Sequence, residues 1–226
     1  MGAVKALVPL PAKHAVRRLL RRPPDSARRY LRPGVTVDEF LGRLTEFGVR
    51  YAVLRWFETL PHVEAGEDMD MLVADQDLPV AESLLTPYRR LRSAQKVDLY
   101  TAGGLPRTTW GGVPYFSPEL AARVLNGAVL LRGRYKVPSP VDHLNSLAFH
   151  AVYHKGAASG LPQDEPAGSP VRGRIGPALE RLSRESLPGL ELTLSALELH
   201  VAREGLAPSA EALAAFAAER LRLYGS

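Results

Sequence analysis

Three aspartates stand in the two stretches of this sequence that most resemble buried strands. Asp68 and Asp70 alternate with methionines in GEDMDMLV, and Asp98 interrupts the apolar run KVDLY. Alternate residues of a strand point to the same face, so Asp68 and Asp70 should project together, and Asp98 should join them if the two strands are adjacent. Neighbouring carboxylates repel one another unless a cation lies between them, and hard cations such as Mg²⁺ prefer oxygen ligands that they share with substrate phosphates. We therefore predict that the three aspartates bind Mg²⁺ or Mn²⁺; the alternative is that they are strand-end or loop residues in water.

A line of histidines is the second candidate. His143, His150 and His154 fall within an arc of about 40° on a helix that is predicted to begin at Pro140. The i, i+4 spacing of His150 and His154 can chelate a metal, but the chain lacks the inserted Glu of H-E-x-x-H, so substrate contact or a structural role is favoured over zinc. Lys155 ends the helix, where it would bind phosphate or offset the helix dipole. We expect the histidine face to look toward the aspartates, in which case His150→Ala weakens substrate binding more than it lowers stability.

The elements that must position these residues are marked by caps and by hydrophobic spacing. Thr36 and Glu39 form the pattern of a capping box, and apolar residues at helical spacing follow until Gly48, a typical C-terminal glycine. The further elements expected before residue 102 are a strand at 51–54, a strand at 69–73, a helix at 78–91 with Val80, Leu84, Leu85 and Leu91 in the core, and a strand at 96–101.

The second half of the chain is predicted to become helical. Two β-prone runs around Gly111-Gly112 predict a hairpin at 107–116. Ser139 as N-cap and Pro140 at the first helical position predict a helix over 140–155, ended by Gly156. The other expected elements are paired extended segments at 128–132 and 135–137, a mobile loop near 156–174, and two or three helices over 177–224.

The order of helix, strand, D-x-D strand, helix and Asp-bearing strand resembles the nucleotidyltransferase superfamily, which has the fold of DNA polymerase beta and of the antibiotic nucleotidyltransferases. The pieces that carry the resemblance are YAVLRWF, GEDMDMLV and KVDLY, within residues 36–101. The family has a Gly-Ser pair before its D-x-D that clasps the triphosphate, whereas this chain has LRWFE there. Arg55 in that segment would either replace the clasp by a guanidinium–phosphate contact or be an ordinary surface arginine. The later segment YKVPSPVDHLNSLAFHAVYHKG resembles segments of nucleotidyltransferase-like proteins from bacterial surface-polysaccharide gene clusters.

The resemblance implies an α+β fold: a small mixed β-sheet with flanking helices, followed by a C-terminal helical region. We expect a basic flexible arm at 1–34 that contributes little to the core, a nucleotidyltransferase-like domain at 35–138, and a helical region at 139–226. The implied activity is metal-dependent transfer of a nucleotidyl group from an NTP to a hydroxyl or phosphate acceptor. Asp68, Asp70 and Asp98 would be catalytic and metal-binding, and Arg55, His150, His154 and Lys155 would bind the nucleotide. The alternative is an inactive relative that binds a nucleotide or a protein partner. A third possibility is the antitoxin type of small nucleotidyltransferase, which modifies a protein partner.

The charge of the chain is unevenly distributed. The formal net charge is +5, of which residues 1–34 carry +8, so the rest of the chain carries −3. Nucleic-acid-binding domains usually have a basic face of their own, so nucleic acid is not an expected partner, whereas the basic segment could make weak contact with an anionic membrane surface. The absence of cysteine excludes disulfides and thiolate metal sites. It also fits the cytoplasmic location that we expect, in which residues 1–34 could bring the protein to the inner face of the membrane.

Overall fold

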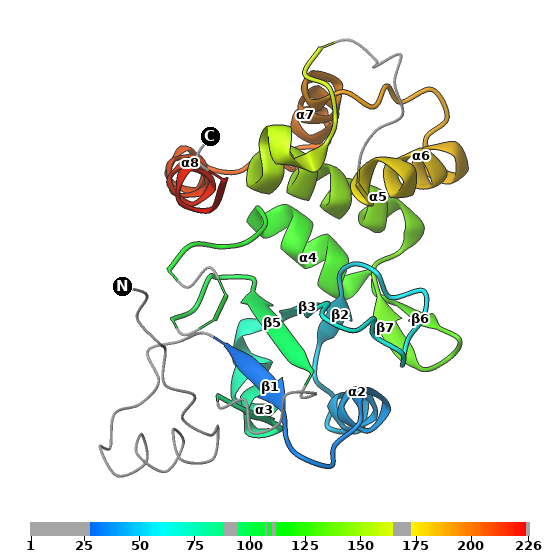
Figure 1. The fold of residues 1–226 in the computed structure, drawn as a ribbon, viewed down its shortest axis with the longest axis vertical. Helices are drawn as coiled ribbons and strands as arrows, with labels where there is room; N and C mark the ends of the chain where they lie inside the picture. The colour runs from blue at the N-terminus through cyan, green and yellow to red at the C-terminus, as the bar shows by residue number, and fades with distance from the viewer. Residues whose placement is uncertain (1–27, 88–94, 107, 110–111, 165–172, 225–226) are drawn as a thin grey trace, which may run out of the picture.

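The computed structural model describes residues 28–87, 95–106, 108–109, 112–164 and 173–224. These residues form an α+β fold with a mixed five-stranded sheet in the order β2-β3-β5-β1-β4, a separate two-stranded sheet and seven α-helices. Figure 1 shows the sheet in one half of the molecule and most of the later helices in the other. The α+β class and the mixed sheet with flanking helices are therefore confirmed. None of the helices in the described ranges is long and apolar enough to cross a membrane.

The first half begins with the predicted capped helix. In α2 (Val37–Glu46), the Thr36 hydroxyl accepts a hydrogen bond from the backbone N–H of Glu39, and the Glu39 carboxylate accepts one from the backbone N–H of Thr36, as a capping box requires. Gly48 follows with φ 70°, a conformation that glycine adopts without a Cβ clash. The chain then enters β2 (Tyr51–Val53), which confirms the strand expected at 51–54.

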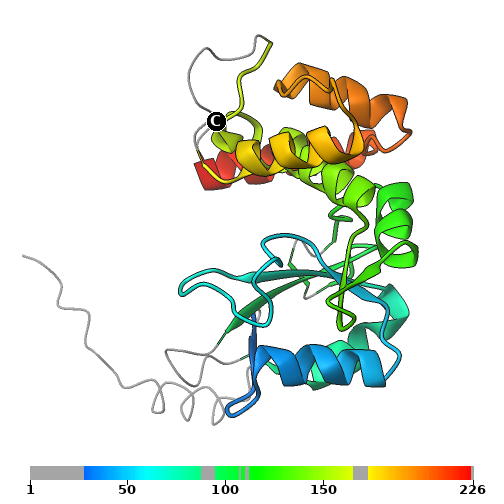
Figure 2. The same cartoon turned by 90° about the vertical axis from the view of Figure 1, so that its right-hand side faces the viewer.

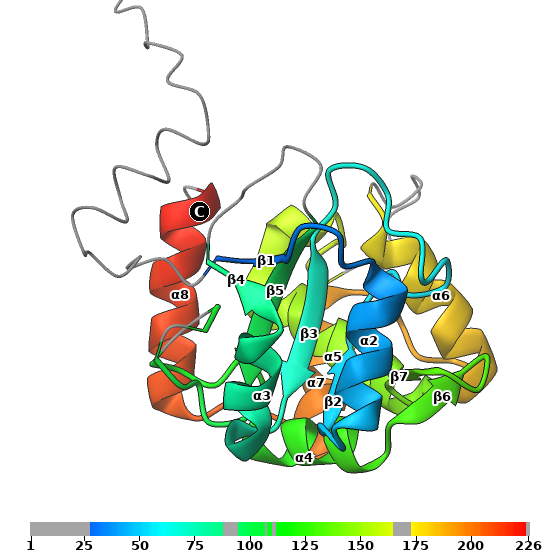
Figure 3. The ribbon, with the colours of Figure 1, turned by 90° about the horizontal axis from the view of Figure 1, so that it is seen from below.

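The central strands have the mixed arrangement that places the aspartates. Strand β3 (Met69–Val73) runs antiparallel to β2 and parallel to β5 (Lys96–Thr101). Their side chains alternate between two hydrophobic clusters, one on each face of the sheet. Met69, Met71 and Val73 belong to the cluster that includes α2, whereas Leu72 packs with the later helices. Figure 3 shows α2 and α3 covering one face of the sheet, with α5 on the far side.

The helix predicted over 78–91 is much shorter. A 3-10 turn (Asp75–Asp77) leads into α3 (Leu78–Ser83), and the chain then becomes extended in β4 (Leu85–Thr86). Leu85 is buried as a strand residue because it pairs with β1, while Val80 is exposed on α3 and Leu84 is only partly buried. The expected core residue Leu91 lies outside the described residues.

The N-terminal segment contributes to the sheet, which corrects the expectation that residues 1–34 add little to the core. Strand β1 (Arg29–Leu31) lies between β5 and β4 and pairs antiparallel with both, and all three of its residues are buried. Two neighbouring strands satisfy the backbone of β1 on both sides, so this piece of a highly charged segment is structural. Residues 1–27 of the predicted arm lie outside the described residues.

The hairpin predicted at 107–116 is wrong for the residues described there. Thr108, Thr109 and 112–116 form turns and irregular chain with no strand, and they lead to α4 (Pro118–Asn126). The predicted pairing after α4 is confirmed, because β6 (Val129–Leu131) and β7 (Tyr135–Val137) form an antiparallel pair.

The helical layer starts with α5 (Pro140–Phe149), capped by Ser139 as predicted. The helix widens to a π-helix (His150–Lys155) and ends in a 3-10 turn (Gly156–Ser159). The helices expected over 177–224 are three: α6 (Ile175–Ser186), α7 (Leu194–Arg203) and α8 (Ala210–Tyr224). Figure 2 shows this layer stacked above the sheet. The chain enters the layer after β7, which still contacts β2 of the sheet. Residues 165–172 of the predicted mobile loop lie outside the described residues, and the domain division near residue 138 stays a prediction.

Candidate functional site

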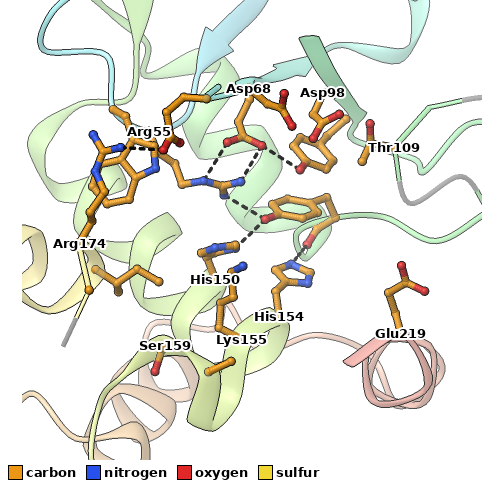
Figure 4. Close-up of a pocket in the computed structure, with 18 of the residues that line it drawn as sticks. Arg55, Asp68, Asp98, Thr109, His150, His154, Lys155, Ser159, Arg174 and Glu219 are labelled. Carbon is orange, nitrogen blue, oxygen red and sulfur yellow. Dashed lines mark hydrogen bonds and ion pairs between the residues drawn. The ribbon is translucent and has the colours of Figure 1, made fainter. Parts of the chain in front are cut away.

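A cleft with a cavity volume of about 1180 Å³ lies between the sheet and the helical layer, and all three predicted aspartates line it (Figure 4). Asp70 and Asp98 are direct partners on the adjacent parallel strands β3 and β5, so their side chains share a face. Asp68 precedes β3 by one residue and reaches the same cleft. The three aspartates therefore line one cleft, as alternation along two adjacent strands predicts. That their carboxylates share a cation stays a prediction.

Lys96 already provides a cation for two of the three carboxylates. Its ammonium group donates hydrogen bonds to Asp68 and to Asp98, whose nearer oxygen is 2.9 Å away. Burial opposes the charge on Lys96, but the hydrogen bonds to the two carboxylates outweigh it and raise the pKa of Lys96. The pKa of Asp98 is also raised, chiefly because burial disfavours the carboxylate form and despite the neighbouring ammonium.

Asp70 is held by a different cation. The Arg55 guanidinium binds it in a bidentate pair, with NH2 2.7 Å from Oδ1 and Nε 3.1 Å from Oδ2. Tyr100 donates a further hydrogen bond to Asp70 Oδ1 at 2.9 Å. Only 9% of the Arg55 side chain is exposed, so the interpretation of Arg55 as an ordinary surface arginine is wrong. Although burial opposes its charge, Asp70 raises the pKa of Arg55 well above its usual value.

Tyr115 connects this ion pair to the helical layer. Arg55 NH1 donates to the Tyr115 hydroxyl at 2.9 Å, and that hydroxyl lies 2.7 Å from His150 Nδ1. His154 Nε2 lies 2.8 Å from the backbone carbonyl oxygen of Tyr115, and the His154 ring stacks on the Tyr115 ring at 4.0 Å. The chain of contacts from Asp70 through Arg55 and Tyr115 to His150 therefore joins the sheet to the π-helix that follows α5.

The three histidines of the predicted helix, His143, His150 and His154, lie in two different environments. His150 and His154 line the cleft, as predicted, in the π-helical stretch, a rare backbone form that is frequent at functional sites. His143 instead packs in the interior, with its ring 4.7 Å from that of Phe57. Burial lowers the pKa of His143 to about 4 and that of His154 to about 3, and it lowers the pKa of His150 well below its usual value. All three imidazoles are therefore neutral at physiological pH. Lys155 lines the cleft next to them.

Sequence reasoning missed several residues that shape the site. Lys96 is two residues before Asp98, so the same alternation that grouped the aspartates could have placed its ammonium beside them. Tyr115 gives no such signal, because it lies in irregular chain before α4 and reaches the site only through the fold. Trp56 and Arg174 stand at one side of the cleft, with the Arg174 guanidinium carbon 4.5 Å from the centroid of the Trp56 ring.

No cluster of three or more His, Asp or Glu side chains in the described ranges has the arrangement of metal ligands. With Lys96 and Arg55 in place, the aspartates are bound to basic side chains.

Comparisons of the chain with protein-family models, with curated proteins and with solved structures gave no match.

Proposed function

We propose that the cleft is the active site of a metal-dependent nucleotidyltransferase, which moves a nucleotidyl group from an NTP to a hydroxyl or phosphate acceptor. One observation carries the proposal: Asp70 and Asp98 are paired on adjacent parallel strands, and Asp68 joins them at a cleft that also has basic walls. The resemblance of the segment around α5 to proteins of surface-polysaccharide gene clusters supports an acceptor from surface-polysaccharide metabolism.

The chemistry of the three aspartates suits a hard divalent cation, although their present arrangement, with Lys96 and Arg55 bound to them, is not that of metal ligands. Asp68, Asp70 and Asp98 offer carboxylate oxygens, which Mg²⁺ and Mn²⁺ prefer. Such a cation would help to activate the attacking oxygen and would offset charge on the leaving pyrophosphate. It would have to displace the Lys96 ammonium from Asp68 and Asp98, and the displaced ammonium would then be close enough to bind a phosphate of the nucleotide. His150 and Lys155, on the facing wall, would contact the nucleotide from the helical side.

A second candidate is a catalytically inactive relative that binds a nucleotide or a protein partner. The specific observation in its favour is that each of the three aspartates already forms an ion pair with Lys96 or Arg55. The LRWFE segment at the place of the family's Gly-Ser pair favours the same interpretation.

A nucleotide-binding titration with and without Mg²⁺ separates these candidates. For the transferase, NTP binding should depend on Mg²⁺ and should be lost in Asp98→Asn; pyrophosphate should be released only when an acceptor with a free hydroxyl or phosphate group is also present. The matched control is Glu180→Gln, which removes one negative charge from the exposed side of α6. NTP binding that is indifferent to Mg²⁺ would support the inactive relative. No binding of any NTP would refute nucleotide binding altogether.

A further inference from the structure

Trp56 has an unusual backbone conformation beside the aspartates. It follows Arg55 with φ 55°, and Arg132 is the other non-glycine residue with positive φ in the described ranges. Bulky side chains rarely adopt this conformation, and such strain persists where the surrounding structure requires it, often at ligand sites. The consequence here is that the chain leaving β2 directs consecutive side chains, Arg55 and Trp56, to the lining of the same cleft.

The Trp56 ring carries a planar cation on one face. The Arg174 guanidinium carbon is 4.5 Å from the ring centroid, which is within the range of a cation–π contact. Arg174 is held there by ion pairs with Glu64 at 3.4 Å and Glu67 at 3.3 Å, and all three side chains are about half exposed. Exposed ion pairs contribute little because solvent screens them. The planar Arg174 guanidinium therefore covers one face of the Trp56 ring but is held there only weakly.

The position of the ring fits the base of a nucleotide. Trp56 and Asp68 line the large cleft together, and they also line a small adjoining cavity of about 50 Å³. A ligand stacked on Trp56 would therefore have its remaining atoms close to the aspartates and to Lys96. Stacking on an aromatic side chain tolerates any base, since every base has a π-face.

We propose that Trp56 is the stacking platform for the heteroaromatic base of the nucleotide, and that the Arg174 guanidinium occupies this place until the base displaces it. This inference rests on the proposed function, because it takes the ligand of the aspartates to be a nucleotide. It assigns a contact to the base, which is the part of the nucleotide that phosphate and metal contacts do not recognise.

The chain offers a direct optical test, because its two tryptophans are Trp56 and Trp110. In a Trp110→Phe background, Trp56 is the single tryptophan emitter. The protein is titrated in Mg²⁺ with each of the four ribonucleoside triphosphates and with inorganic tripolyphosphate, which has no base. We expect at least one nucleotide to quench or shift the Trp56 emission, and tripolyphosphate to bind without a comparable change.

Substitution of the ring gives the thermodynamic test. Trp56→Gly removes the ring, and glycine accepts a positive φ, so this variant should fold. Calorimetry should show nucleotide binding about tenfold weaker or worse, with tripolyphosphate binding unchanged, while Trp56→Phe should retain most of the nucleotide affinity. Undiminished nucleotide affinity in Trp56→Gly would refute the platform and leave the proposed function intact. If neither nucleotide nor tripolyphosphate binds the wild-type protein, the proposed function and the platform both fail.

Discussion

Replacing Lys96 by methionine removes the cation that Asp68 and Asp98 share while keeping a side chain of similar length. In the wild-type protein, a divalent cation must compete with this ammonium for the two carboxylates. In Lys96→Met the competitor is absent, and the two acids are left to repel each other until a cation binds. We therefore expect the variant to bind Mn²⁺ more tightly than the wild type.

The size of the effect follows from the exposure of the three side chains. Lys96 is 26% exposed, Asp68 38% and Asp98 18%. Fully exposed ion pairs contribute about 0 to 1 kcal/mol and hydrogen bonds to charged groups about 1.5 to 3 kcal/mol, so we assign about 1 kcal/mol to each of the two contacts. Their sum of about 2 kcal/mol corresponds to Mn²⁺ affinity roughly 30-fold higher, at 1.4 kcal/mol per factor of ten.

The assay is a Mn²⁺ titration followed by electron paramagnetic resonance, at neutral pH and physiological ionic strength. The matched control is Lys155→Met, which removes the same charge from the opposite wall of the cleft and should change the affinity by no more than about twofold, because salt screens charges that are not in contact. Thermal unfolding gives a second measure: without metal, Lys96→Met should be less stable than the wild type, and Mn²⁺ should raise its stability more.

Two results would refute this reasoning in different ways. Equal Mn²⁺ affinity in the wild type and in Lys96→Met would show that the ammonium does not compete for the aspartates. Absence of Mn²⁺ binding in both proteins would show that the aspartates form no divalent-cation site, and it would remove the metal from the proposed function.

Two further predictions concern the fold. Leu31→Ala, which truncates a 4% exposed side chain in β1, should lower the free energy of unfolding by about 2 to 5 kcal/mol. The control Leu130→Ala, at a 54% exposed position in β6, should lower it by less than about 0.5 kcal/mol. Urea denaturation measures both, and equal effects would contradict a structural role for β1. His143 is neutral in the folded protein, because burial lowers its pKa from 6.5 to about 4, so below pH 6.5 the unfolded chain binds a proton that the folded chain does not, and the stability that this difference contributes is lost as pH falls from 6.5 toward 4. Between pH 6.5 and pH 4, the free energy of unfolding of His143→Leu should therefore fall by up to about 3 kcal/mol less than that of the wild type. Urea denaturation across a pH series measures this difference, and parallel pH profiles for the two proteins would contradict it.

Local patterns were sufficient for two helix starts and for the grouping of Asp68 with Asp70. The capping box at Thr36 and the N-cap at Ser139 define helix starts through contacts within a few residues, so the sequence could predict them. Asp68 and Asp70 were correctly grouped because alternation along a strand is a local property. The failure at 78–91 has the opposite cause, because Leu85 leaves the helical pattern to pair with β1, a strand more than fifty residues earlier in the chain.

The sequence by itself determined the capped helices and the grouping of Asp68 with Asp70, since each of these depends on residues close together in the chain. Only the tertiary structure decided what the carboxylates contact. The in-register pairing of Asp70 with Asp98, the bidentate contact from Arg55 and the link through Tyr115 to His150 all join residues that are far apart in sequence. The physical reason is that charge neutralisation in a half-buried cleft depends on which side chains the fold brings within a few ångströms, and no local spacing specifies that.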